Sequence, residues 1–265
     1  MSRPARPQAT VSALRRGIAV LQCFDEGSHF LSNAEISERT RVPKPTVTRL
    51  AATLVSLGLM RQDPETERYC LGAGVLSLAR NFLSGLDVRM HARPHLARLA
   101  ESFGASAFLA VRDGPDMVLI EASRARSSVL TMRMDVGSRL PMMASALGRA
   151  YLSALPETER AQLLDELRRD QPGDWPRLRT GIEQAMRDAA ASGYCASLGE
   201  LRAEVNSIAV PLTLPGGEHV ALNCGGPAFA FPEARLRSDV APRLLAAARA
   251  IAAEIGGSLQ QTKAA

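Results

Sequence analysis

Apolar residues recur at helical spacing in three short segments near the start of the chain. The first segment covers residues 12–24. The second covers 32–40 and opens on Ser32, with Glu35 three residues later, which is the spacing of a capping box. The third covers 45–57, and the glycine that follows it is a common residue just beyond a helix end. The pattern predicts three consecutive helices.

A turn of only three residues, 41–43, separates the second and third segments. On a helical wheel, one face of the third segment carries its apolar residues Val47, Leu50, Ala51, Leu54 and Leu57. The opposite face is small and polar. Two short helices joined in this way are typical of a DNA-binding helix-turn-helix, here centred on residues 32–57. An ordinary helical hairpin with a solvated outer face is the alternative.

Two short strands are expected next, at 59–62 and 67–71, around a turn-rich connection. A hairpin directly after a recognition helix forms a wing, which favours the DNA-binding interpretation. Arginine side chains can read guanine, and lysine together with a helix N-terminus favours phosphate. The expected DNA contacts are Arg15, Lys44, Thr46, Thr48, Arg49, Arg61 and Arg68.

Helical and strand patterns alternate in the remainder. Helices are expected at 72–84, 87–103, 144–154, 157–169 and 232–256, and at a segment with a Thr180–Glu183 capping box that ends at Gly193. Strands are expected at 105–112, 116–124, 127–135, 194–198, 206–213 and 218–225. Hairpin-linked strands between helices indicate a mainly antiparallel sheet, so the fold class is α+β. The expected domains are a winged helix-turn-helix at 1–72, a linker helix at 73–86 and a larger domain at 87–265.

Charge and composition add to this interpretation. The 265 residues carry a net charge of +5. Residues 1–89 hold 12 Lys and Arg against 8 Asp and Glu, a net +4, so an anionic partner is expected at the front of the chain. The sequence shows no apolar segment typical of a secretory signal or a membrane span, so a cytoplasmic protein is expected. No phosphate loop or dinucleotide fingerprint occurs, and no cofactor is expected.

Two features allow a different chemistry. His91 and His95 are four residues apart on an expected helix, a spacing that can present two imidazoles to one metal ion. Cys224 is a potential nucleophile, with His219 as a distant base. The alternative function is therefore a small-molecule enzyme with an appended helical domain. A solvated helix face and a buried strand cysteine explain the same residues, and an enzyme is not the favoured interpretation.

The ordered motifs resemble the IclR family of transcription regulators over nearly the whole chain. In the front third the resemblance rests on "SALRRGIAVLQCF", "LSNAEISERTRVPKPTVTRLAATLVSLGLM" and "ERYCLG". In the remainder it rests on "ARPHLARLAESFG", "VGSRLPMMASALGRAYLSALP", "ASGYCASLGELRAEVNSIAVPL" and "VALNCGGP". Two of these segments, "VGSRLP…GRA" and "SIAVP", resemble the branch that regulates aromatic-acid catabolism.

The resemblance implies a ligand-responsive repressor or activator of a catabolic operon. Its partners would be a double-stranded DNA operator, a small organic or aromatic acid as effector, and further copies of the chain in a homodimer or a dimer of dimers. It also implies that the larger domain is GAF-like and binds the effector.

By matching motifs, the residues lining the effector site would be Val129, Met132, Leu140, Ala146, Leu147, Ser197, Ser207, Asn223 and Gly225. Three of them, Ser197, Asn223 and Gly225, differ from the residues of members that sense small keto acids. The resemblance therefore implies a larger or more apolar acid.

Overall fold

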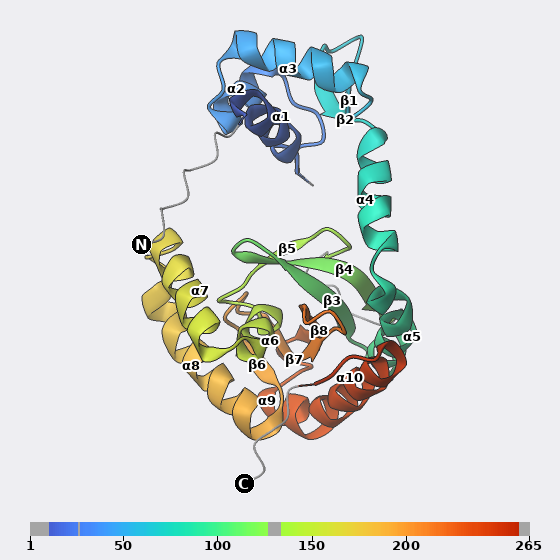
Figure 1. The fold of residues 1–265 in the computed structure, drawn as a ribbon, viewed down its shortest axis with the longest axis vertical. Helices are drawn as coiled ribbons and strands as arrows, with labels where there is room; N and C mark the ends of the chain where they lie inside the picture. Colours follow the sequence, from blue (N-terminus) through green and yellow to red (C-terminus); the bar gives the residue numbers. More distant parts are fainter. Residues whose placement is uncertain (1–10, 26, 127–133, 260–265) are drawn as a thin grey trace, which may run out of the picture. The chain divides into compact units, whose positions relative to one another are not determined.

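The computed structural model describes residues 11–25, 27–126 and 134–259. The chain separates into two compact units, Met1–Gly85 and Leu86–Ala265 (Figure 1). The helices and strands of the first unit are α1 (Ser12–Gln22), α2 (Asn33–Thr40), α3 (Lys44–Ser56), β1 (Met60–Gln62), β2 (Tyr69–Leu71) and α4 (Gly74–Ser84). The predicted helix-turn-helix and its hairpin are confirmed, with β1 and β2 antiparallel.

The three helices α1–α3 enclose a small apolar core. Val20 of α1, Ile36 of α2 and Val47 of α3 are fully buried there. The prediction that Leu57 belongs to the buried face of α3 is wrong, because this residue is the C-cap of the helix and is 64% exposed. The wheel fails at this position because the chain turns away after Ser56.

Glycines bring the start of α4 against the end of α3. Gly58 adopts a φ of +70°, the left-handed conformation that ends a helix. Its carbonyl accepts a hydrogen bond from the backbone N–H of Gly74 at 3.0 Å. A Cβ at Gly72 or Gly74 would collide with that carbonyl, so only glycine permits this close approach.

The second unit is built on one sheet of six strands, each antiparallel to its neighbours, in the order β5-β4-β3-β8-β7-β6. The strands are β3 (Ser106–Asp113), β4 (Asp116–Arg124), β5 (Arg139–Pro141), β6 (Cys195–Leu198), β7 (Val205–Thr213) and β8 (His219–Pro227). This sheet confirms the predicted α+β class.

Helices cover both faces of the sheet. They are α5 (Asp87–Phe103), α6 (Ala146–Ala154), α7 (Glu157–Asp170), α8 (Trp175–Ser192), α9 (Glu233–Arg235), a π-helical turn (Leu236–Val240) and α10 (Ala241–Ile255). Helix α6 packs against β6, β7 and β8, while α5 packs against β3 and β4, and α10 lies beside α5 (Figure 1). Side chains of α6 and α8 share an apolar core with one face of the sheet.

Two predicted elements differ from the structure. The capping box at Thr180 and Glu183 is wrong, because α8 begins at Trp175 and both residues lie inside it. Glu183 pairs instead with Arg179 one turn earlier. The predicted strand at 127–135 falls largely outside the described residues, and the strand that pairs with β4 is β5. Helix α8 ends at Gly193, as predicted.

A buried arginine ties α6 to the far edge of the sheet. Arg149 is 1% exposed, and its guanidinium donates to the carboxylate of Glu200, at 2.5 Å from Nη1 and 2.6 Å from Nη2. It also donates to the carbonyls of Met143 and Ala196. Each acceptor of this group would lose a charged partner if the arginine were removed.

We expect Arg149→Leu to lower the free energy of unfolding of this unit by about 3 kcal/mol, because it removes the charged donor from two carbonyls and from the Glu200 carboxylate, which retains the Leu198 N–H at 3.2 Å. Trp175 is the single tryptophan of the chain and packs against the core of this unit, so its fluorescence during urea unfolding reports the loss. The matched control is Arg177→Leu, which removes an exposed arginine bonded to the Glu200 carbonyl. A similar, small effect of both variants would contradict the expectation.

Candidate DNA-binding face and effector site

The start of α2 is held by a complete capping box. The Ser32 side chain accepts from the Glu35 backbone N–H at 3.3 Å, and the Ser32 N–H donates to the Glu35 carboxylate at 2.7 Å. Arg68 of the hairpin donates to both oxygens of the same carboxylate, at 3.0 and 2.8 Å. The hydrogen bonds from Ser32, and then from Arg68, lower the pKa of Glu35 to about 2.

Arg68 therefore has a structural task. Its guanidinium also donates to the carbonyl of Phe30 at 2.9 Å, so it joins the hairpin to the residues in front of α2. Sequence reasoning placed Arg68 among the DNA contacts because it adds positive charge to the expected wing. The pair with Glu35 was missed, because the two residues are 33 positions apart and no local pattern links them.

The outer face of α3 presents the other predicted contacts. Lys44, Thr48 and Arg49 are exposed, and Thr46 is half-buried. The Thr48 hydroxyl accepts from the Asn33 side chain at 2.9 Å and donates to the Lys44 carbonyl at 3.1 Å. Asn33, the first residue of α2, was missed by the sequence analysis, because this contact depends on how the two helices cross.

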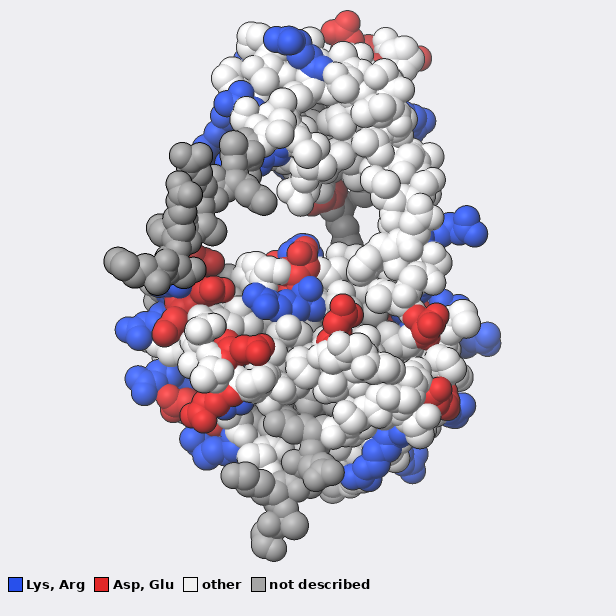
Figure 2. Space-filling model, viewed as in Figure 1, with Lys and Arg blue, Asp and Glu red and all other residues white. Residues whose placement is uncertain are grey.

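The two remaining predicted contacts lie outside the helix pair. Arg15 is exposed on α1, and Arg61 is exposed on β1. On the face shown in Figure 2, acidic atoms lie at the tip of the hairpin, which carries Asp63, Glu65 and Glu67. The wing is therefore less basic than its two arginines suggest.

In the second unit the strand register brings several predicted effector residues together. Ser197 of β6 is paired with Ser207 of β7, which is paired with Gly225 of β8. Residues directly paired in an antiparallel sheet have side chains on the same face. Asn223 lies two residues from Gly225 and thus on this face as well. We call these positions the polar row.

Helix α6 packs over the polar row. The Ser197 hydroxyl donates to the carbonyl of Ala144, just before the helix, at 2.6 Å. Ala146 and Leu147 form the first turn of α6 and are buried in the core that the helix shares with the sheet. The first N–H groups of a helix have no partner within it, and here the Ser145 side chain takes only that of Gly148.

The remaining predicted effector residues differ in their contacts and in their place on the sheet. The Asn223 side-chain oxygen accepts from the Phe108 N–H at 3.1 Å, so part of this amide is used within the sheet. A Cβ at Gly225 would collide with Asn206 and Ser207, which requires glycine there. Leu140 is buried on β5, toward the other edge of the sheet. Val129 and Met132 lie outside the described residues.

The register also adds residues that sequence reasoning missed. Gly225 is paired with Ser106 of β3, and Ser106 with Arg124 of β4, so the polar row continues across five strands. Arg124 was missed because its place beside the predicted site depends on the pairing of β3 with β8, which no sequence motif records.

The alternative enzyme chemistry lacks its nucleophile. Burial raises the pKa of the Cys224 thiol to about 12, and that of Cys195 to about 12 as well. His219 is bonded to Thr213 and packs edge-on against Tyr151. A buried thiol with such a pKa is protonated at neutral pH and does not act as a nucleophile.

His91 and His95 both contact a carboxylate from a distant part of the chain. Glu254 of α10 is 3.1 Å from Nδ1 of His91 and 3.0 Å from Nε2 of His95, and both contacts join α5 to α10. These hydrogen bonds, that of His95 first, lower the pKa of Glu254. Across residues 11–25, 27–126 and 134–259, no group of three or more His, Cys, Asp or Glu side chains is placed to hold a metal ion.

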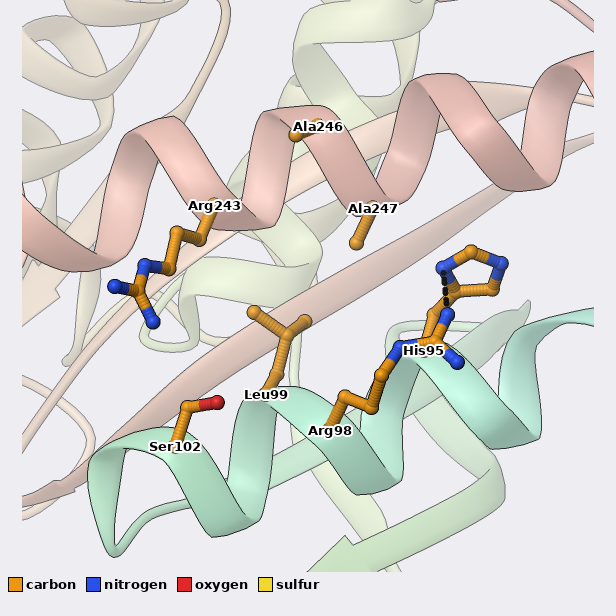
Figure 3. A pocket seen from close by; sticks show the side chains of 7 residues that line it. All are labelled: His95, Arg98, Leu99, Ser102, Arg243, Ala246 and Ala247. Carbon is orange, nitrogen blue, oxygen red and sulfur yellow. Dashed lines mark hydrogen bonds between the residues drawn. The ribbon is translucent and has the colours of Figure 1, made fainter.

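A groove of about 300 Å³ lies beside this cluster, between α5 and α10 (Figure 3). His95, Arg98, Leu99 and Ser102 come from α5, and Arg243, Ala246 and Ala247 from α10. Arg98 contacts Nδ1 of His95 at 2.9 Å. The groove is on the α5 side of the sheet, opposite the polar row.

In the described part of the chain, no helix is both long and apolar enough to cross a membrane.

Comparison with known proteins gives matches over most of the chain. The model described as the IclR helix-turn-helix domain matches residues 13–64, and the one described as the bacterial transcriptional regulator IclR C-terminal matches residues 80–253. The HTH-type transcriptional regulator TsaQ1/TsaQ2 of Comamonas testosteroni is 34% identical over 248 residues, which are 92% of this chain and 88% of that protein.

Solved structures are similar as well. An IclR family transcriptional regulator from Brucella abortus has a TM-score of 0.85 and 40% identity, with 96% of each chain covered. An IclR homologue from Microbacterium hydrocarbonoxydans, complexed with 4-hydroxybenzoate, has a TM-score of 0.70 at 24% identity, with 92% of this chain and 99% of that chain covered. At this identity the second likeness shows the fold alone.

The Glu35 carboxylate of the capping box should make the stability of α2 depend on pH. The lowered pKa of Glu35 means that its carboxylate stabilises the first unit fully above about pH 4.5, and that this contribution is lost as the pH falls toward 2. We expect Glu35→Gln to increase hydrogen exchange in the α2 peptide at pH 6. The difference from the unsubstituted protein should shrink between pH 4.5 and 2.

The matched control is Glu38→Gln, at an exposed position of the same helix. This variant should exchange like the unsubstituted protein at every pH. A difference for Glu35→Gln that stays constant down to pH 2 would show that its carboxylate charge does not stabilise α2.

Proposed function

Because the chain belongs to the IclR family of transcriptional regulators, we propose that it controls a catabolic operon in response to a small organic acid. The single observation that carries the DNA-binding part is the outer face of α3, where Lys44, Thr48 and Arg49 are exposed beside a capped α2. The family consists of regulators with a helix-turn-helix, so an enzyme is not proposed.

In this proposal α3 enters the major groove of a double-stranded operator. Arg49 reads a guanine, while Lys44 and Thr46 at the helix start meet phosphate. Thr48 contributes its exposed methyl side, since its hydroxyl is bonded to Asn33. Arg15 and Arg61 add phosphate contacts, and Arg68 supports the hairpin that carries Arg61.

Two helices of the first unit support a homodimer, alone or as part of a dimer of dimers. Helix α4 has no buried residue, although it is rich in apolar side chains. Three of these, Leu76, Leu78 and Phe82, are more than half exposed. On α1, Leu14 is 66% and Ile18 is 44% exposed. Apolar helix faces of this kind favour association with a second copy, which would present two recognition helices to a two-fold operator.

The proposed effector site lies on the polar row beneath α6. The hydroxyls of Ser197 and Ser207 and the amide of Asn223 offer neutral hydrogen bonds, and the N–H groups of Ala146 and Leu147 suit a carboxylate. Leu140, together with Val129 and Met132, would supply apolar contacts. The complex of the Microbacterium relative with 4-hydroxybenzoate supports an aromatic acid as the class to test first.

Effector binding would then shift the population between two arrangements of the protein that differ in operator affinity. Such a shift requires that the acid bind the two arrangements with different affinities, so acid and operator affinities must be coupled reciprocally.

We expect Arg49→Ala to weaken binding to operator DNA by about 10- to 100-fold, because it removes a base contact worth about 1–3 kcal/mol. Lys44→Ala should weaken binding to all sequences and reduce the slope of log affinity against log salt by about 1. Fluorescence anisotropy with the intergenic DNA upstream of the gene, at several salt concentrations, measures both.

Arg249→Ala removes the same charge from an exposed position on α10 of the second unit and serves as the control. It should leave operator affinity unchanged. Loss of affinity in all three variants would point to overall charge, and no specific binding by the unsubstituted protein would refute the DNA-binding proposal.

An acid that binds the folded second unit should raise its unfolding temperature. At 100 times its dissociation constant it stabilises the fold by about 2.7 kcal/mol. A thermal-shift panel of benzoate, 4-hydroxybenzoate and short-chain aliphatic acids tests this, with the corresponding amides as neutral controls. Absence of stabilisation by any acid would contradict an organic-acid effector of these classes.

A further inference from the structure

Arg124 is the last residue of β4 and stands at the end of the polar row. Ser106 is paired with it on one side and with Gly225 on the other, so its side chain is on the α6 face of the sheet. The next row confirms this orientation, because Ala122 and Phe108, two residues from Arg124 and Ser106, pack in the core beneath α6. Two strand spacings, about 10 Å, separate the backbones of Arg124 and Gly225.

The guanidinium of Arg124 is incompletely paired. Its Nε atom is buried and has no hydrogen-bond partner among the described residues. The nearest carboxylate is that of Asp135, 3.6 Å from an Nη atom, which is longer than a normal hydrogen bond, and the Asp135 side chain is 74% exposed. A buried N–H without an acceptor is costly, so this group is poised to gain an acceptor.

Two other arginines on this face already have hydrogen-bond partners. Arg149 is fully engaged by Glu200 and by two carbonyls. Arg112, at the opposite end of β3, donates to the carbonyl of Gly114 and lies over the ring of Tyr151. Among the residues that the structure describes, Arg124 is thus the cation on this face with an unsatisfied donor at the polar row.

From these observations we infer that Arg124, rather than the N–H groups of Ala146 and Leu147, binds the carboxylate of the effector, an inference that rests on the proposed organic-acid effector. Its fork of N–H donors pairs with both oxygens of a carboxylate, and Nε gains the acceptor it lacks. The body of the acid then lies along the row, from Arg124 past Ser106 toward Ser207. This arrangement selects monocarboxylates over neutral compounds of the same shape.

The experiment compares each acid of the panel with its amide, by calorimetric titration of the full chain. The unsubstituted protein should prefer an acid, for example 4-hydroxybenzoate, over 4-hydroxybenzamide. Arg124→Met, which keeps an unbranched apolar stem and removes the guanidinium, should weaken acid binding by about thirtyfold or more and abolish that preference. Arg124→Lys should restore part of it, since the charge returns without the fork.

Two further measurements separate a binding role from a structural one. Without ligand, Arg124→Met should unfold at the same or a higher temperature, because it removes an unsatisfied donor. The matched control, Arg112→Met, removes a cation from the same face and should keep the preference for the acid.

The possible failures are distinguishable. If no acid of the panel binds the unsubstituted protein, the organic-acid effector is refuted, and the role of Arg124 with it. If an acid binds and Arg124→Met retains its affinity and its preference over the amide, only the role of Arg124 is refuted. A ligand-free Arg124→Met protein that unfolds at a clearly lower temperature would assign Arg124 a structural role and would also overturn the inference.

Discussion

The second unit depends on one constraint, the alternation of side chains along strands that are covered by helices on both faces. Most residues of β3, β4, β7 and β8 must fit beneath either α5 and α10 or α6. Polar groups are tolerated under either layer only where they find partners. Glu121, on the α5 side of β4, is buried and forms ion pairs with Arg89 and Arg93. On the α6 side, Arg149 forms an ion pair with Glu200. Arg124 is the member of this set whose pairing is incomplete within the described residues.

Much of the fold was predictable because its signals are local. The capping box at Ser32, the stop at Gly58 and the long helix that ends at Gly104 each depend on neighbouring residues, and all occur where the sequence places them. The capping box expected at Thr180 shows the limit of such signals. The same spacing occurs inside a helix, where Glu183 makes an ion pair instead.

The sites were predictable only in part, because their geometry depends on contacts between distant segments. Family likeness indicated Ser197, Ser207 and Gly225, but it did not indicate that they pair directly with one another. The expected wing indicated Arg68 as a DNA contact, but it did not indicate the ion pair with Glu35. Asn33, Arg124 and the partner of the two histidines, Glu254, depend on helix crossing, strand order and helix packing respectively. None of these is encoded by residue spacing along the chain.

The contact among Gly58, Gly72 and Gly74 has a mechanical consequence. Backbone touches backbone there, with a 3.0 Å hydrogen bond from Gly74 to Gly58 and no side chain between them. Such a joint resists displacement, since moving the two segments closer brings main-chain atoms into collision and moving them apart breaks this hydrogen bond. The start of α4 is therefore in direct main-chain contact with the residue that ends α3. A rotation applied to α4 turns α3 by a similar angle, and even a small rotation can move its side chains out of register with base edges.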